Sequence, residues 1–148
     1  MSVKVTGNIT SHFTIDEYAI ANPKSTVDIS PEALKFARLL EKFRVKVKRR
    51  MIVTSWLRTP ATNKKVGGIA TSNHLKGTAC DFHFNVKLTE KMFVKYAKMW
   101  KEICEDNGVV GEAGLYSWGM HLGVQTYSKK FFHWDTRSGK QKNNPFNI

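Results

Sequence analysis

The sequence has few cysteines and no long apolar segment. Its two cysteines, Cys80 and Cys104, allow one disulfide at most, and the lack of a Cys-x-x-Cys pair excludes a cysteine-based zinc finger. We expect Cys104 to be a small buried thiol on an amphipathic helix. No segment approaches the roughly 18 apolar residues that a membrane-spanning helix requires, so we expect no membrane span.

Acidic residues are also scarce, with 12 Asp and Glu against 24 Lys and Arg, for a formal net charge of +12. Such a charge favours polyanionic partners, whether nucleic acid, an anionic membrane surface or an acidic cell-wall polymer, without choosing among them. The basic residues are scattered along the chain and concentrate only at residues 46–50. No nucleic-acid recognition motif accompanies them, so we expect no nucleic-acid partner.

The length of 148 residues, with 41% hydrophobic and 24% charged residues, is typical of one folded domain. Three helix starts are readable. Residues 14–17 form a Thr-x-x-Glu capping box, and Ser-Pro-Glu at 30–32 precedes a helical apolar stripe that extends to residue 43. A third helix begins at Thr89 and ends at Asn107-Gly108.

Strand patterns occupy the rest of the chain. Residues 51–55 predict a buried strand, and 56–68 predict an irregular loop suited to substrate contacts. Residues 80–86 alternate between apolar and polar side chains, so this strand has a core face and a cleft face. Glycine-punctuated strands follow to residue 136, and we expect a loosely ordered tail from about residue 138. The sequence predicts one monomeric α+β domain over residues 1–148, with N-terminal helices packed on a small antiparallel sheet.

Two segments carry candidate metal ligands. His74 and Asp81 lie seven residues apart, with Gly77 between them to fold the histidine back over the start of the strand. Zinc takes histidine nitrogens and carboxylate oxygens, and a catalytic site keeps three protein ligands and one open position. In the second segment, His133 and Asp135 share one strand face. A histidine flanked by aromatic residues can be an ordinary core residue. We favour a metal ligand here, because Asp135 is placed to fix the ring as a backing carboxylate, or to act as a general base.

Several segments together resemble the zinc D-Ala-D-Ala carboxypeptidase family. The most specific is the Ser-x-His-x-x-Gly-x-Ala-x-Asp pattern at 72–81, and residues 54–68 and 132–137 also match. The family includes bacterial murein peptidases, phage endolysins and vancomycin-resistance dipeptidases, and it shares its zinc fold with the Hedgehog signalling domain. Residues 9–18 are similar to the opening segment of short phage and bacterial members, so the resemblance spans about residues 9–137.

The resemblance implies one Zn²⁺ ion held by His74, Asp81 and His133. Arg58 matches the arginine that binds the substrate carboxylate, or the oxyanion of the tetrahedral intermediate, in the family. Ser72 matches a position beside the zinc motif, with a structural or substrate-contacting role.

The sequence departs from the family where the general base is expected. Lys130 stands three residues before His133, where several branches have an acid, and Phe131 stands where others have a histidine. Asp135 is then the preferred catalytic base, as in the branch that ends in Phe-x-His-x-Asp. The remaining candidates for this role are His83, Glu112 and His121.

The implied function is zinc-dependent hydrolysis of peptidoglycan stem peptides, by a D,D-carboxypeptidase, a D,D-endopeptidase or an L-alanyl-D-glutamate endopeptidase. The alternative is a non-catalytic, zinc-containing module that binds the cell wall. Anionic wall polymers are further partners that suit the positive charge. The N-terminus lacks the apolar core of a signal peptide. We therefore expect a protein made in the cytoplasm that reaches the wall, the host's wall if phage-encoded, by another route.

Overall fold

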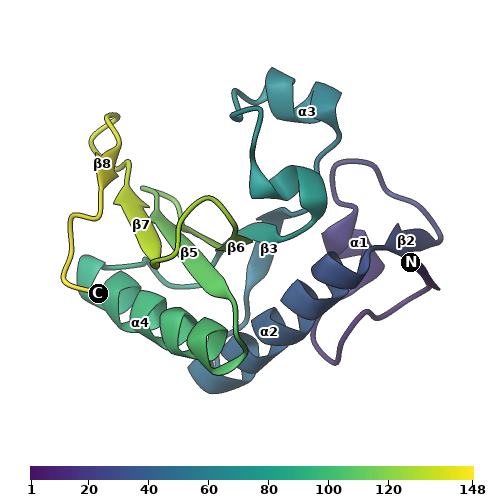
Figure 1. Ribbon diagram of the computed structural model, residues 1–148, viewed down its shortest axis with the longest axis horizontal. Coiled ribbons are helices and arrows are strands. Elements are labelled where there is room, and N and C mark those ends of the chain that lie inside the picture. The colour runs from purple at the N-terminus through teal and green to yellow at the C-terminus, as the bar shows by residue number, and fades with distance from the viewer.

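The computed structural model describes residues 1–148 and is organised around a six-stranded sheet (Figure 1). Its strand order is β3-β4-β6-β5-β7-β8, and every neighbouring pair is antiparallel except β5–β7, which is parallel. The strands are β3 (Ile52–Ser55), β4 (Ala79–His83), β5 (Val110–Leu115), β6 (Met120–Gln125), β7 (Phe132–Asp135) and β8 (Lys142–Asn143). A separate antiparallel pair consists of β1 (Val3–Val5) and β2 (Val27–Ile29).

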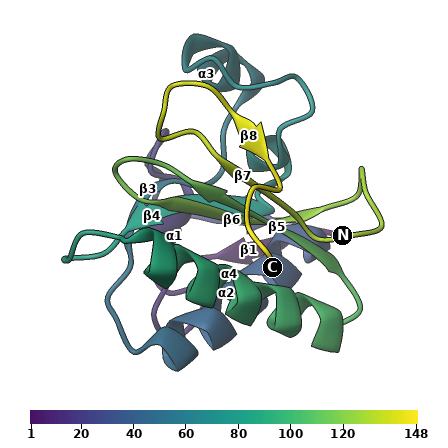
Figure 2. The same ribbon diagram turned by 90° about the vertical axis from the view of Figure 1, so that its left-hand side faces the viewer.

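The helices lie on both faces of this sheet. They are α1 (Ile15–Tyr18), α2 (Pro31–Val47), α3 (Pro60–Lys65), the 3-10 helix η1 (Asn73–Lys76) and α4 (Glu90–Asp106). Helices α2 and α4 cover one face, and α3 stands on the other (Figure 2). The predicted α+β class is confirmed. None of these helices has the length and apolar content to cross a bilayer.

The helix starts follow the capping signals in the sequence. The capping box of Thr14 and Glu17 opens α1, with the Thr14 hydroxyl accepting from the Glu17 amide. Ser30 accepts from the Ala33 amide at 3.2 Å at the start of α2, and Thr89 accepts from the α4 backbone at 3.1 Å. Each such cap typically stabilises its helix by about 1 kcal/mol.

The core lies between the sheet and the two long helices. Phe43 of α2 and Trp100 of α4 meet edge to face at 6.1 Å, and Phe43 meets Phe82 of β4 at the same separation. All three rings are less than 2% exposed. Burying such side chains contributes roughly 1.5–3 kcal/mol each, so this contact fixes which face of β4 turns inward. Cys80 and Cys104 are buried free thiols in this core.

Two predicted segments differ from the structure. The segment 56–68, expected to be an irregular loop, contains α3, because Thr59 caps it by accepting from the Thr62 amide and Pro60 occupies its first position. The predicted strand 80–86 ends at His83, beyond which no neighbouring strand pairs with it. Val86, expected to face the core, is 46% exposed.

Part of the C-terminal tail, which we expected to be loosely ordered, packs against the sheet. Strand β8 pairs with β7, and the amide of Asn144 donates to the carbonyl of His133 at 2.7 Å. The amide of Phe146 donates to Nε2 of His133 at 3.0 Å, and the Phe146 ring stacks on the same imidazole. His133 therefore holds the tail against the sheet.

This contact predicts a pH-sensitive tail. Burial lowers the pKa of His133 below its ordinary value, and only the unprotonated Nε2 can accept the Phe146 amide. At about pH 6 the imidazole of His133 therefore binds more protons in the unfolded chain than in the folded one. The stabilisation from its hydrogen bond to Phe146 is present at neutral pH and is lost as the pH falls below about 6.5. Between pH 7.5 and pH 5 we expect the Phe146 amide to lose hydrogen-exchange protection, after correction for the intrinsic exchange rate.

The Asn144 amide provides a matched control in the same tail, because it donates to a backbone carbonyl that does not titrate. Its protection should fall less than that of Phe146. Unchanged protection of the Phe146 amide down to pH 5 would show that His133 does not control the tail.

Candidate metal centre

His74 is positioned by a tight turn before β4. The Ser72 hydroxyl accepts from the His74 amide at 3.3 Å and caps η1. Gly77 ends η1 with a left-handed φ of 71°, a conformation that suits glycine, and the chain then reverses into β4. The loop-closing role expected of Gly77 is therefore observed. Ser72 has a structural contact within the turn.

Asp81 and His121 lie in one row across the sheet. Asp81 of β4 is directly opposite His121 of β6, which is opposite Gly114 of β5, which is opposite Trp134 of β7. Side chains in such a row project from the same face. Nδ1 of His121 lies 2.8 Å from Oδ1 of Asp81, and its ring packs 4.9 Å from Trp134. A Cβ at Gly114 would lie 2.4 Å from the Trp134 ring, so this contact requires glycine.

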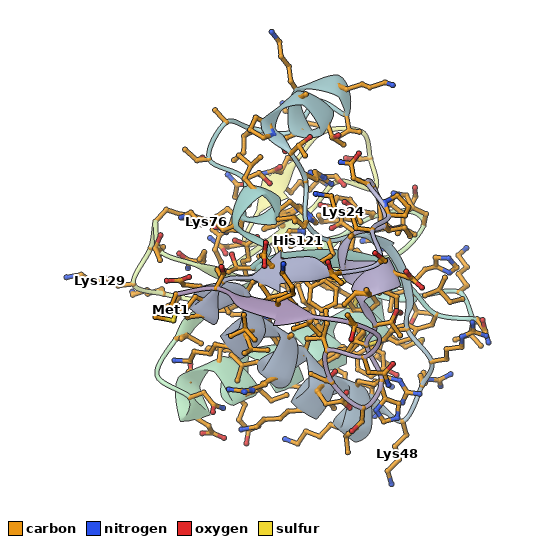
Figure 3. All side chains as sticks on the ribbon, turned by 90° about the vertical axis from the view of Figure 1, so that its right-hand side faces the viewer. Met1, Lys24, Lys48, Lys76, His121 and Lys129 are labelled. Carbon is orange, nitrogen blue, oxygen red and sulfur yellow. The ribbon has the colours of Figure 1, made fainter.

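His74 completes a group of three donors. Its Nε2 lies 3.2 Å from Oδ2 of Asp81, and donor atoms from His74, Asp81 and His121 all lie within 4.8 Å of one another. All three residues are buried. Figure 3 shows His121 in the middle of the molecule, whereas Lys48 and Lys129 project at its periphery.

The donor set fits a zinc ion. Nδ1 of His74 lies 2.7 Å from the Trp56 carbonyl oxygen, which only accepts, so Nδ1 donates to it. In the neutral imidazole the lone pair is then on Nε2. That Nε2 is buried and makes no hydrogen bond. A lone pair aimed at a neighbouring carboxylate and imidazole is the arrangement that a cation satisfies, and two histidines with one aspartate are typical zinc ligands.

Electrostatics within the group favour ionised Asp81. Burial raises the pKa of Asp81, but the hydrogen bond from His121 and the positive charge of that imidazole outweigh burial, so the pKa falls below its ordinary value. Burial lowers the pKa of His121, but the charge of Glu112 and the hydrogen bond to Asp81 raise it to about 9. Asp81 is thus an anion at neutral pH, as a metal ligand must be.

Glu112 of β5 lies behind the His121 ring. One carboxylate oxygen bonds Nε2 of His121, and the other accepts from the Asn73 side-chain amide and, at 3.2 Å, from the Tyr127 hydroxyl. Burial raises the pKa of Glu112, but the charge of His121 and these hydrogen bonds lower it below its ordinary value. Glu112 is therefore a buried, fully partnered carboxylate.

Arg58 joins the site from the loop after β3. Its Nη2 lies 3.1 Å from Oδ2 of Asp81, and its Nε donates to the Ser55 hydroxyl at 3.0 Å. Nη1 contacts the Asn63 side-chain oxygen at 3.4 Å. A guanidinium has five N–H groups, so two remain for another acceptor. The sequence-based expectation placed Arg58 at the site, and the structure brings it there.

His133 does not join the group, which corrects the predicted ligand set. It lies opposite Ala113 of β5, in the row that continues through Leu122 to Cys80. That row faces the core, whereas Asp81 projects from the other face. His133 therefore cannot share an ion with His74 and Asp81, and its Nε2 is bonded to the tail amide of Phe146.

Asp135 is separated from the centre for the same reason. It lies two residues beyond His133 on the same strand face, in the row of the core residue Leu115. Its carboxylate is bound by Arg137, with Nη2 2.7 Å from Oδ2, and Arg137 also reaches Glu90 of α4 at 2.9 Å. Asp135 thus ties the end of β7 to α4 and is not a candidate base for this centre.

His83 is a further imidazole, on the same face of β4 as Asp81. It follows Asp81 by two residues along β4 and is partly exposed. Its Nδ1 lies 3.1 Å from the Phe84 carbonyl oxygen, and its Nε2 makes no hydrogen bond within the protein.

The local sequence around His121 contained a signal for its position. Met120 and Leu122 are fully buried in the core, and the alternation of a strand then sends the residue between them to the opposite face. The same alternation was present around His133. Only the register of the strands distinguishes the two histidines.

We predict that His121→Ala weakens zinc binding more than His133→Gln. Loss of His121 removes a donor atom, and we expect the zinc dissociation constant to rise by more than the roughly 10–100-fold typical of a residue that only orients a ligand. Glutamine at position 133 keeps an acceptor for the Phe146 amide, so zinc affinity should stay within about twofold. Competition with a fluorescent chelator measures both constants, and the reverse ranking would restore His133 as the ligand.

Comparison with known proteins identifies a family for this chain. The chain matches the family model described as Peptidase M15 over residues 11–114, which is 104 of its 148 residues. The matched region includes His74, Asp81 and Glu112 and ends before His121. A search of curated proteins gave no match. The chain belongs to the peptidase M15 family.

Proposed function

We propose that this protein is a zinc-dependent peptidase that hydrolyses peptidoglycan stem peptides. The observation that carries the proposal is the buried group of His74, Asp81 and His121, whose donor atoms lie within 4.8 Å of one another on a sheet face shared with Arg58. Membership of a peptidase family supports hydrolysis of an amide bond. The stem-peptide substrate is inferred from the resemblance to murein peptidases, and the charge of +12 suits an anionic wall.

His74, Asp81 and His121 would hold the zinc ion. When bound, zinc would polarise the scissile carbonyl and lower the pKa of water, so that the water loses a proton more readily and becomes a stronger nucleophile. The Asp81 carboxylate contributes negative charge to the site and is held in place by Arg58 and His121. The Trp56 carbonyl fixes the His74 ring from behind, so the donors are oriented by the fold itself.

Arg58 is the group that binds substrate in this proposal. Its guanidinium is held by Ser55 and Asp81, and its two remaining N–H groups are available to a substrate carboxylate or to the oxygen that becomes negative during hydrolysis. Because the guanidinium is already oriented, little side-chain freedom is lost when a substrate arrives.

The proton carrier is assigned by position. Both oxygens of Glu112 are bonded behind the His121 ring, and Asp135 faces the core side of the sheet. His83 projects from the same face as Asp81, about 7 Å along the strand, with its Nε2 unbonded. In our proposal this Nε2 takes a proton from the attacking water and returns it to the leaving amine.

A non-catalytic wall-binding module is the second candidate. It is favoured by one observation: the two acidic candidates for the base, Glu112 and Asp135, are both engaged elsewhere. This alternative predicts a protein that binds zinc and sediments with cell walls without cutting them.

Digestion of peptidoglycan separates the two functions. The zinc-loaded protein, incubated with purified peptidoglycan of several chemotypes, should release new stem-peptide ends detectable by mass spectrometry. The identity of those ends distinguishes carboxypeptidase from endopeptidase cleavage. His121→Ala should abolish the products and His133→Gln should preserve them. A zinc-loaded protein that binds every chemotype and cuts none would refute the peptidase.

We predict that His83→Gln lowers the turnover number by about 10²–10⁴-fold, the usual contribution of a positioned acid–base group. Zinc content and the substrate KM should change little, because His83 holds neither metal nor substrate in this proposal. Steady-state kinetics with a purified muropeptide and metal analysis of the same sample measure all three quantities. Unchanged turnover would rule out His83 as the proton carrier.

A further inference from the structure

We infer that Glu112 is the residue that positions His121 for metal binding, and that it does so through a space left by Gly123. This inference rests on the proposed metal centre and concerns a carboxylate that the hydrolytic steps above do not use.

Glu112 and Gly123 lie directly opposite each other on β5 and β6. A Cβ at position 123 would lie 2.9 Å from Cγ, 3.0 Å from Cδ and 3.1 Å from Oε2 of Glu112. These distances are shorter than ordinary contacts between a Cβ and a neighbouring atom. The Glu112 side chain therefore occupies the volume that the Cβ of any other residue at position 123 would fill. His121 lies two residues before Gly123 on β6 and projects from the same face. Its Nε2 therefore reaches the Glu112 carboxylate.

The carboxylate joins the two segments that supply the histidine donors. One oxygen bonds His121 on β6, and the other accepts from the side-chain amide of Asn73, the residue directly before His74 in η1. The exposed Tyr127 donates its hydroxyl to the same oxygen at 3.2 Å. Glu112 therefore sets the position of η1 relative to β6 as well as the orientation of one ring.

The chemistry at His121 follows from what a carboxylate can do. An ionised carboxylate only accepts hydrogen bonds, so the His121 nitrogen that faces Glu112 carries a hydrogen. The other nitrogen, Nδ1, points to Asp81 at 2.8 Å. It is the nitrogen that would release its hydrogen and bind the ion, while Nε2 keeps its hydrogen bond to Glu112. Metal-binding histidines are commonly oriented in this way by a carboxylate on the second ring nitrogen.

Zinc affinity of metal-free protein tests this role without any catalytic assay. Glu112→Ala should raise the zinc dissociation constant by about 10–100-fold. Glu112→Gln, which keeps the volume and one acceptor oxygen, should give a smaller rise. Asp135→Asn is the matched control, because it removes a buried carboxylate from the opposite sheet face, and its constant should stay within about twofold of the wild type.

Gly123→Ala provides the specific test, because it adds one methyl group and removes no functional group. We expect roughly a tenfold weaker zinc affinity, by displacement of Glu112. In the Glu112→Ala background the same substitution has no carboxylate to displace, so it should change the constant by less than about twofold. The absorption spectrum of the cobalt-substituted protein should change in Gly123→Ala as it does in Glu112→Ala, since both alter the geometry of the same ligand.

The outcomes separate this inference from the proposed function. A wild-type protein that binds no zinc would refute the metal centre itself. A wild type that binds zinc, with unchanged affinity in both Glu112 variants, would overturn the positioning role and leave the peptidase proposal intact. Equal losses from Gly123→Ala in both backgrounds would show that the glycine acts on the fold alone. If Glu112→Ala does not fold, Glu112→Gln carries the same comparison.

Discussion

The antiparallel pairing of β4 with β6 is the constraint on which the site depends. It places Asp81 opposite His121, so a carboxylate and an imidazole meet on one face while Phe82 and Met120 enter the core on the other. A shift of this register by one residue would exchange the two faces and bury the metal donors among apolar side chains. The packing of α2 and α4 against the core face therefore fixes this register, and with it the position of the metal donors on the opposite face.

Burying an ionised aspartate is costly unless the surrounding groups replace its water. In place of water, the Asp81 carboxylate contacts Arg58, His121 and His74. Each of these residues comes from a different segment of the chain. The same contacts that make the anion tolerable bring the donors into one small volume. Stability and function are coupled here, since losing one partner both exposes an unpaired charge and opens the site.

Local patterns predicted the features that depend on neighbours in sequence. The capping residues Thr14, Ser30 and Thr89 begin helices, and Gly77 turns His74 back towards β4. The choice between His121 and His133 was beyond such patterns, because both lie in alternating strands. It depends on the parallel pairing of β7 with β5, which puts His133 in the row of the core residues.

Three glycines lie close to His121, and they restrict which substitutions this site can accept. Gly114 lies across from it, Gly119 directly precedes its strand β6, and Gly123 lies two residues after it on that strand. Added methyl groups there would strike Trp134, the Phe82 carbonyl and Glu112 respectively. Two of these neighbours contact the imidazole itself: Trp134 packs on the ring and Glu112 bonds its Nε2. Substitution of any of these three glycines would displace a different neighbour. The position of His121 thus depends on residues that have no reactive side chain.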